Sequence, residues 1–273
     1  MCLPGTVETV REHQPGVTRR AALAGGGAAA LAAMMPAAAA GQRRRRRQRG
    51  RVVDLTHRLT AGFPVYTGIA VSRTTAVTIE DDGFYSQDWT LNEHSGTHLD
   101  APGHFTAGGR LVDELRPREL VLPIVVVDIS GRARRDPDAV VRPEDLRRYE
   151  RRHGRIPRGA LVAMDSGWGR KVGDEAAFKG GEAGDYHFPG FGEDAIELLL
   201  GRRAAAIGVD TLSLDPGDSA TFPVHVNWLG ADNYGIENLA NLDRIPPRGA
   251  VATVGVIPWQ EGSGGPARVL ATY

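Results

Sequence analysis

Three histidines and an aspartate fall within the eleven residues from His94 to His104, which read HSGTHLDAPGH. The sequence holds a single cysteine, Cys2, close to the N-terminus. Imidazole and carboxylate groups without thiolate form the donor set that suits zinc or manganese in a site open to substrate. The run therefore predicts a catalytic metal centre.

The spacing of the run favours an extended chain. In a strand, alternate side chains share a face, so His94, His98 and Asp100 would point the same way. Gly96 would lie on that face, where it has no side chain to obstruct an ion. On a helix the two histidines would share a face but Asp100 would lie well away from them. We therefore expect a strand over this run.

Further donors are needed to complete such a site. Pro102-Gly103 breaks the strand and predicts a turn that brings His104 back toward the cluster. Far downstream, His225 and Glu237 offer another imidazole and carboxylate. Alone they would indicate little, because histidine is common on surfaces and a glutamate often begins a helix. His225 and Glu237 become candidate ligands because the first cluster does not fill every coordination position of a metal ion.

The run from His94 to His104 resembles the HxGTHxDxPxH signature of the metal-dependent cyclase family, which includes bacterial kynurenine formamidases and isatin hydrolase. The resemblance extends from about Val52 to Tyr273. It implies an α/β protein with the swivelling β/β/α fold, in which a mixed sheet packs with helices, and a homodimer or homotetramer. It passes through the segments Phe188-Pro189-Gly190, Gly208–Thr211, Leu214–Gly217, Gly235–Leu239 and Gly264–Val269.

The resemblance assigns a role to each matching position. His104 matches the catalytic histidine of the family, which moves protons. The other matches imply metal ligands, and the last two help to hold a second ion in binuclear members: His94, His98, Asp100, His225 and Glu237. We therefore expect one or two zinc or manganese ions per chain.

Such a site predicts hydrolysis. A divalent ion held by imidazoles and a carboxylate lowers the pKa of bound water and polarises a carbonyl group. We expect cleavage of an amide-like C–N bond, in an aryl formamide or a cyclic amide, with His104 transferring protons. The alternatives are a cyclase or lactonase acting on a C–O bond, and a non-catalytic metal- or ligand-binding protein on the same fold. A serine hydrolase is disfavoured because the sequence lacks a Gly-x-Ser-x-Gly elbow.

Other polar residues allow two interpretations each. Asp210 and Asp215 could orient ligand histidines, although Asp215 also begins an Asp-Pro-Gly turn. Residues 165–168 follow a strand and form either a substrate-facing loop or a turn with a packed indole. Arg268 could meet a substrate carboxylate or an internal acid. Structural or surface roles are expected for three remaining histidines, His57, His153 and His187.

The elements that would position these residues alternate between strand-like and helix-like segments. Helices are expected from Pro143 to Tyr149 and from Glu193 to Leu200, with Gly201 ending the second. This alternation is typical of an α/β domain, and residues 52–273 suffice for one with a sizeable core. No internal repeat or second domain boundary is evident. Strands are expected at residues 51–56, 74–79, 120–129, 160–165, 204–209 and 250–257.

The N-terminal region differs from the rest. Arg19-Arg20 precedes an apolar stretch, rich in Ala and Gly, that ends near Ala40. This pattern predicts a twin-arginine export signal over residues 1–40, and hence a periplasmic or extracellular protein. The stretch is too weakly hydrophobic for stable membrane insertion. The alternative is an Ala-rich extension that arises from a misplaced start codon.

An arginine-rich segment, residues 41–51, follows the predicted signal. We expect a disordered linker, with binding to an anionic surface as the alternative. Residues 1–50 hold nine arginines and two acids, which leaves 24 basic and 31 acidic residues in the remainder. The remainder therefore has a net charge of −7 with histidine neutral, which disfavours nucleic acid as a partner. We expect a small-molecule substrate.

Overall fold

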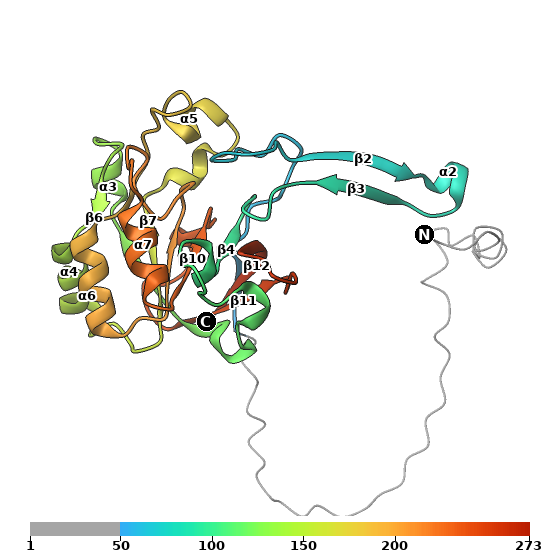
Figure 1. Ribbon diagram of the computed structural model, residues 1–273. Coiled ribbons are helices and arrows are strands. Elements are labelled where there is room, and N and C mark those ends of the chain that lie inside the picture. The colour runs from blue at the N-terminus through green and yellow to red at the C-terminus, as the bar shows by residue number, and fades with distance from the viewer. Residues whose placement is uncertain (1–49) are drawn as a thin grey trace, which may run out of the picture. The chain divides into compact units, whose positions relative to one another are not determined.

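The computed structural model describes residues 50–273, and the predicted export signal and most of the arginine-rich linker lie outside the described residues. The described chain falls into two compact units (Figure 1). Residues 73–89 form the smaller unit, and residues 50–72 together with 90–273 form the larger one. The sequence predicts no boundary within residues 52–273. The structure nevertheless separates residues 73–89 from the rest as a compact unit.

The smaller unit is a two-stranded hairpin with a short helix at its tip. Strands β2 (Ser72–Val77) and β3 (Ser86–Thr90) pair with each other, and α2 (Ile79–Asp82) lies between them. The Thr78 hydroxyl accepts a hydrogen bond from the Asp81 amide at 3.2 Å and so caps the helix. Gly83, at φ +80°, ends it.

The larger unit is built on an eight-stranded sheet in the order β1-β12-β11-β5-β7-β9-β10-β4. Because β12 also pairs with β4, the sheet closes into a barrel. Strands β5, β7, β9 and β10 run parallel, and the other pairings are antiparallel. The bounds are β1 (Val52–Asp54), β4 (His98–Asp100), β5 (Val121–Asp128), β7 (Leu161–Asp165), β9 (Ala206–Val209), β10 (Tyr234–Glu237), β11 (Ala250–Val256) and β12 (Gly264–Thr272).

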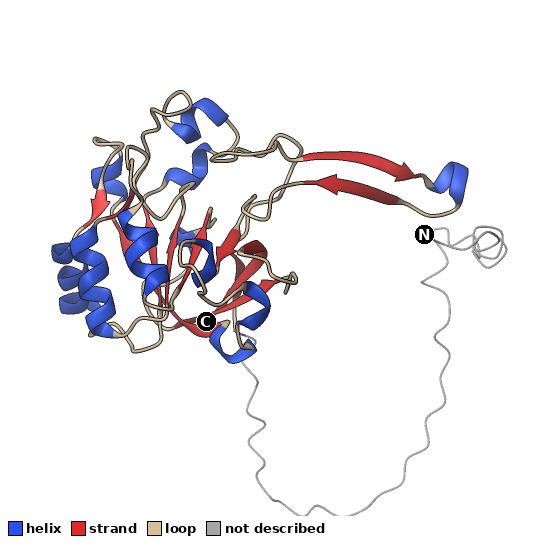
Figure 2. Ribbon diagram, in the orientation of Figure 1, coloured by secondary structure: helices blue, strands red, loops and turns tan. Residues whose placement is uncertain are grey.

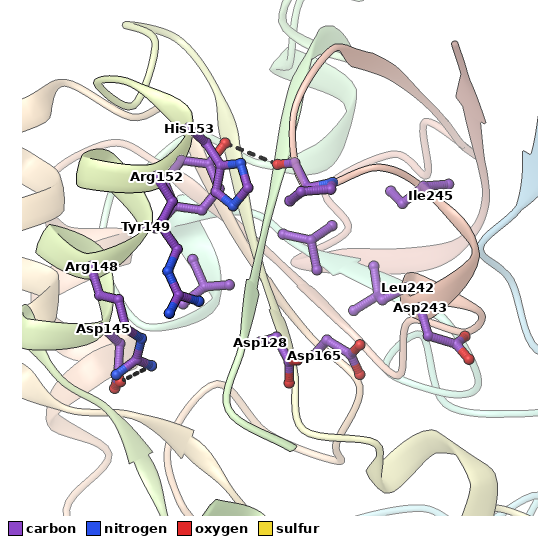
Figure 3. A pocket seen from close by; sticks show the side chains of 13 residues that line it. Asp128, Asp145, Arg148, Tyr149, Arg152, His153, Asp165, Leu242, Asp243 and Ile245 are labelled. Carbon is purple, nitrogen blue, oxygen red and sulfur yellow. Dashed lines mark hydrogen bonds and ion pairs between the residues drawn. The ribbon is translucent and has the colours of Figure 1, made fainter. Parts of the chain in front are cut away.

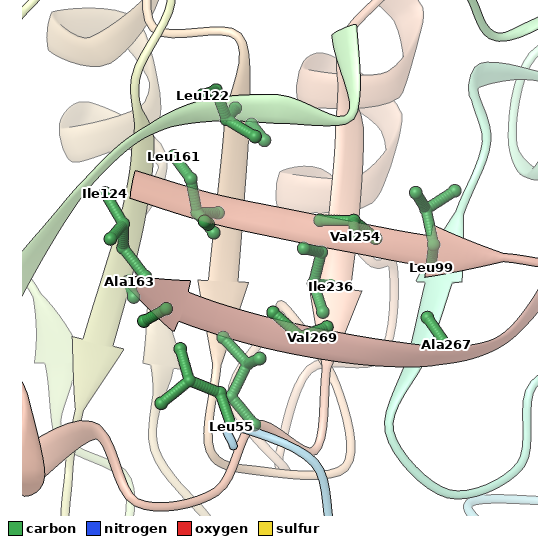
Figure 4. Close-up of a cluster of buried hydrophobic side chains, with 14 of the residues drawn as sticks. Leu55, Leu99, Leu122, Ile124, Leu161, Ala163, Ile236, Val254, Ala267 and Val269 are labelled. Carbon is green, nitrogen blue, oxygen red and sulfur yellow. The ribbon is translucent and has the colours of Figure 1, made fainter. Parts of the chain in front are cut away.

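Three of the parallel strands, β5, β7 and β9, contribute to two hydrophobic cores. Leu161 and Ala163 of β7 point into the barrel, where they join Ile236 and Val269 (Figure 4). The alternate residues of β7 point outward into the second core, beneath the helices. Both faces of these strands are therefore buried, which explains why their sequences are almost continuously apolar.

Three helices cover the outer face of the parallel strands (Figure 2). They are α4 (Pro143–His153), α6 (Glu193–Arg202) and α7 (Pro223–Gly230). No helix in residues 50–273 is long and apolar enough to span a membrane. The remaining elements are short: α3 (Ser130–Ala133), α5 (Glu175–Lys179), the parallel pair β6 (Val140–Val141) and β8 (Gly190–Phe191), and the 3₁₀ turns η1 (Pro102–His104), η2 (Val112–Glu114), η3 (Pro117–Glu119), η4 (Trp168–Lys171) and η5 (Leu242–Arg244).

The mixed sheet packed with helices confirms the expected fold class, and the six expected strands and both helices are present. The predicted end of α6 at Gly201 is wrong. The helix continues to Arg202, and Arg203 ends it by adopting the left-handed conformation at φ +57°. Gly201 has open space around it, so nothing in its surroundings forces the chain to leave the helix there.

Candidate metal centre

Only the second half of the histidine-rich run is a strand. β4 covers His98–Asp100, whereas His94 lies in a turn and Gly96 has a φ of +69°. A Cβ at Gly96 would lie 2.8 Å from Leu59 Cδ1. The strand expected from His94 onward is therefore wrong, and Gly96 serves a left-handed turn against Leu59 rather than clearing space for an ion.

The pairing of β4 with β10 brings the distant glutamate to the run. His98 and Glu237 lie directly opposite each other in the antiparallel register, so their side chains share a face. His98 Nε2 lies 3.2 Å from Glu237 Oε2, and both residues are buried. Since β10 is a strand, the reading of Glu237 as the start of a helix does not apply.

The turn after β4 returns His104 to the cluster, as its Pro-Gly sequence predicts. The turn is η1, whose last residue is His104. The ring of His104 stacks on that of His94 at a centroid distance of 3.9 Å and an interplanar angle of 24°.

His225 reaches the cluster from the first turn of α7, where Asp215 fixes its orientation. Asp215 Oδ2 lies 2.6 Å from His225 Nδ1 and also accepts the His225 amide at 3.1 Å. Its other oxygen, Oδ1, accepts the Val224 amide at 2.9 Å. The opposite ring nitrogen, His225 Nε2, lies 3.1 Å from Glu237 Oε1. Asp215 therefore makes the contact with a histidine of the cluster that the sequence suggested.

Asp100 lies at the centre of the cluster. Its Oδ1 is 2.6 Å from His94 Nδ1 and 3.3 Å from His98 Nε2, and its Oδ2 is 3.8 Å from His225 Nε2. Asp100 belongs to two groups of potential metal donors. One group adds His94 and His104, and the other adds His98 and Glu237. Within each group the donor atoms lie within 4.8 Å of one another.

The cluster meets the requirements of a cation site. His98 Nε2 and Asp100 Oδ2 are buried, and neither forms a well-aligned hydrogen bond within the described residues, although two carboxylate oxygens lie 3.2 and 3.3 Å from His98 Nε2. A buried polar atom without a partner costs free energy, which a coordinated ion would offset. Imidazole nitrogens and carboxylate oxygens are also the donors that zinc and manganese accept. The residues therefore fit one or two divalent ions.

The electrostatics of the cluster also favour a cation, because two buried carboxylates attract positive charge. Burial alone would lower the pKa of His98, but Asp100 and Glu237 outweigh it and raise that pKa to about 10. Burial would also lower the pKa of His225, but Asp100, Asp215 and Glu237 together raise it well above its usual value. His104 differs, since burial, assisted by His94 and His225, lowers its pKa to about 4 and leaves it neutral at pH 7.

A cavity of about 390 Å³ adjoins the cluster and has an aromatic wall. Phe222 lies between Tyr66 and Phe105, with ring centroids 5.8 Å from each. Phe222 itself is left-handed at φ +50°, a conformation that costs a non-glycine residue about 1–2 kcal/mol. Phe105 also packs on His225, with ring centroids 4.6 Å apart. No sequence motif marks this wall, because its members come from three distant segments.

The other polar residues take structural roles. Asp210 accepts hydrogen bonds from the backbone of Ser166, Trp168 and Gly169, and among the described residues it bonds to no histidine. The suggestion that it orients a ligand histidine is therefore wrong. Residues 165–168 form the turn with a packed indole, since Trp168 is buried and donates to Phe178 O at 2.7 Å.

Arg268 meets an internal acid rather than facing the cluster, since its Nη2 lies 2.7 Å from Asp54 Oδ2. His57 is half-buried, and His153 is exposed. His187 pairs with Asp138 at 2.8 Å on the surface. None of these three histidines belongs to the donor groups described above.

Comparison with known proteins places these features in one family. Residues 53–216 match the Cyclase family model. An isatin hydrolase of Roseibium aggregatum is 36% identical over 201 residues, which cover 70% of this chain and 76% of that protein. A kynurenine formamidase of Salinibacter ruber is 30% identical over 157 residues, 58% of this chain and 65% of that one. The crystal structure of an isatin hydrolase bound to the product analogue thioisatinate superposes with a TM-score of 0.78 at 31% identity, over 82% of this chain and 93% of that chain.

Proposed function

The chain belongs to the cyclase family, and from this premise we propose that it is a metal-dependent hydrolase of an amide-like C–N bond. The observation that carries the proposal is the buried cluster around Asp100, which adjoins a cavity large enough for a small molecule. The matched relatives are named isatin hydrolase and kynurenine formamidase, which supports the same reaction class.

The proposed metal centre holds one or two zinc or manganese ions. Asp100 belongs to both donor groups, so it would serve either stoichiometry. A bound divalent ion would lower the pKa of water toward neutrality and polarise the substrate carbonyl. The proposed ligands are His94, His98, Asp100, His225 and Glu237.

His104 is the proposed proton-transfer residue. It is neutral at pH 7, because burial lowers its pKa, so a ring nitrogen can accept a proton from the attacking water. The resulting imidazolium is a strong acid for the same reason and can pass that proton to the leaving nitrogen. Stacking on His94 holds the ring beside the cluster throughout.

The proposed substrate carries an aromatic ring. The rings of Phe105 and Phe222 and the buried position of the cluster favour an aryl group over an extended polar chain. An aryl formamide and a cyclic amide fused to a benzene ring both place a cleavable C–N bond next to such a ring. Isatin and formanilide represent these two classes.

The experiment is turnover by the full chain after loading with zinc or manganese. Isatin and formanilide are the amide substrates, and dihydrocoumarin is a lactone of comparable size. The proposal predicts hydrolysis of at least one amide and loss of that activity on chelation. Turnover of the lactone alone would favour a C–O hydrolase, and a metal-loaded protein inactive on all three would favour a binding protein.

We also propose that residues 1–40 direct export through the twin-arginine route and that the mature protein is a homodimer or homotetramer. The paired arginines support the first proposal and the family resemblance supports the second. The net charge of −7 over residues 51–273 supports a protein that does not bind nucleic acid. Cell fractionation with Arg19→Lys/Arg20→Lys as the control tests export, and light scattering tests the oligomeric state.

A further inference from the structure

A second cavity, of about 370 Å³, opens at the carboxyl ends of β5 and β7 (Figure 3). Helix α4 forms one wall, and the segment from Leu242 to Pro247 forms the other. The cavity shares no lining residue with the one beside the metal cluster. Carboxyl ends of parallel strands are where ligand sites commonly form in α/β proteins.

Two arginines and one aspartate of α4 line one wall of this cavity. Arg148 and Arg152 lie one helical turn apart on α4, so both side chains reach the same side of the helix. Arg148 is already paired with the buried Asp145, at 2.6 Å. Arg152 forms no ion pair within residues 50–273, so its guanidinium charge is uncompensated there.

The floor of the cavity is anionic. Asp128 and Asp165 end neighbouring parallel strands and are partners in the register of β5 and β7. Each accepts one backbone hydrogen bond, from Ser130 at 2.8 Å and from Gly167 at 3.0 Å, and neither pairs with a cation in the described part of the chain. Burial and the neighbouring carboxylates raise the pKa of Asp165 to about 6, so a cation near it would be stabilised.

Apolar side chains also line the cavity. Val127, Leu242 and Ile245 line the cavity, and the last two belong to the wall opposite α4. The Tyr149 hydroxyl donates to Pro247 O at 2.9 Å and so ties the two walls together. No ion pair joins Arg152 to either aspartate within the described residues, so these opposite charges remain available to a ligand.

We propose that this cavity binds a small ω-amino acid, with a carboxylate and an ammonium group at opposite ends of a short apolar chain. The guanidinium of Arg152 receives the carboxylate, and Asp128 and Asp165 receive the ammonium group. The site is separate from the metal centre and does not depend on the proposed hydrolase activity.

Isothermal titration calorimetry on the metal-loaded full chain tests the proposal. The probes are 4-aminobutyrate, 5-aminovalerate and 6-aminohexanoate, with pentylamine and hexanoate as analogues that carry a single charge. At least one amino acid should bind in the millimolar range or tighter, and each single-charge analogue should bind at least tenfold more weakly. No binding of the three amino acids at 20 mM, or equal binding of either analogue, would overturn it.

Charge-removing variants locate the ligand. Arg152→Gln should weaken binding of the amino acid at least tenfold and leave it no tighter than pentylamine. Asp165→Asn and Asp128→Asn should each weaken it at least tenfold, and both retain the oxygen that accepts the backbone hydrogen bond. Arg151→Gln is the matched control, because Arg151 is exposed on α4 but does not line this cavity.

The control variant should change the affinity less than twofold. Equal losses in Arg151→Gln and Arg152→Gln would indicate a general charge effect and would contradict the proposed site. All four variants should retain the metal content of the wild type. Failure of amino acid binding with intact metal binding and hydrolysis would therefore refute this site alone.

Discussion

Asp215→Asn should weaken the metal centre although it removes none of the proposed ligands. Asp215 is fully buried, and its two oxygens accept the amides of Val224 and His225 and the ring Nδ1–H of His225. Asparagine can keep an oxygen toward the Val224 amide. Its NH₂ group then faces the ring of His225, and it can only donate there.

The magnitude follows from the contact that is lost. The Oδ2 to Nδ1 distance of 2.6 Å indicates a charge-assisted hydrogen bond, worth about 1.5–3 kcal/mol. With Nδ1 protonated, the lone pair of Nε2 faces Glu237, where an ion would bind. A donor at Nδ1 favours the other tautomer and points a proton into that position. We expect about 10- to 100-fold weaker metal binding, the usual effect of losing such a partner.

The assay is competition for zinc between the protein and a chromophoric chelator. Asp210→Asn is the matched control, because Asp210 is an equally buried carboxylate that accepts backbone amides and touches no histidine of the cluster among the described residues. It should leave the zinc affinity within about twofold of the wild type. A folded Asp215→Asn protein with wild-type zinc affinity, or an equal loss in Asp210→Asn, would refute the reasoning.

Three further predictions concern the cluster, the aromatic wall and the stability. His98→Ala should lose both metal and turnover, whereas His104→Ala should keep its metal and lose about 10²- to 10⁴-fold in kcat, as metal analysis and kinetics would show; a metal-free His98→Ala enzyme that still turns over would contradict this. Phe222→Ala should raise KM for an aryl amide more than it lowers kcat, and an unchanged KM would argue against the ring wall. The pKa of Asp165 is about 6 in the folded chain and about 4 in the unfolded chain. The free energy of unfolding therefore falls as the pH rises across that window. Asp165→Asn removes this fall and should stabilise the protein at pH 8 by about 1–2 kcal/mol, after allowance for solvent screening, but not at pH 3.5; urea unfolding that shows no difference at pH 8 would contradict it.

The sequence predicted those features that depend only on neighbouring residues. The turn at Pro102-Gly103 predicts the return of His104, and the apolar runs predict β5 and β7, because both faces of those strands are buried. The same reasoning placed His94 in a strand, since alternation cannot reveal the left-handed turn at Gly96.

Contacts between distant segments required the structure. His98 faces Glu237 only because of the register between β4 and β10, which no single segment encodes. Helix α7, which carries His225, has no clear amphipathic pattern in its sequence, because its exposed positions include the apolar Val226 and its buried positions include His225 itself. Strand β12 begins with Gly264–Pro266, residues that predict a turn, yet it closes the barrel by pairing with β4. These features arise from packing, and a local pattern does not report packing.

The most direct test of the account is a metal titration of the chelator-treated full chain, followed by the rate of hydrolysis of isatin and of formanilide. The account predicts no activity at zero equivalents and a linear rise with zinc or manganese that breaks at one or two ions per chain. Activity that survives complete removal of metal, or that never appears although the ions bind, would contradict a metal-dependent hydrolase centred on Asp100.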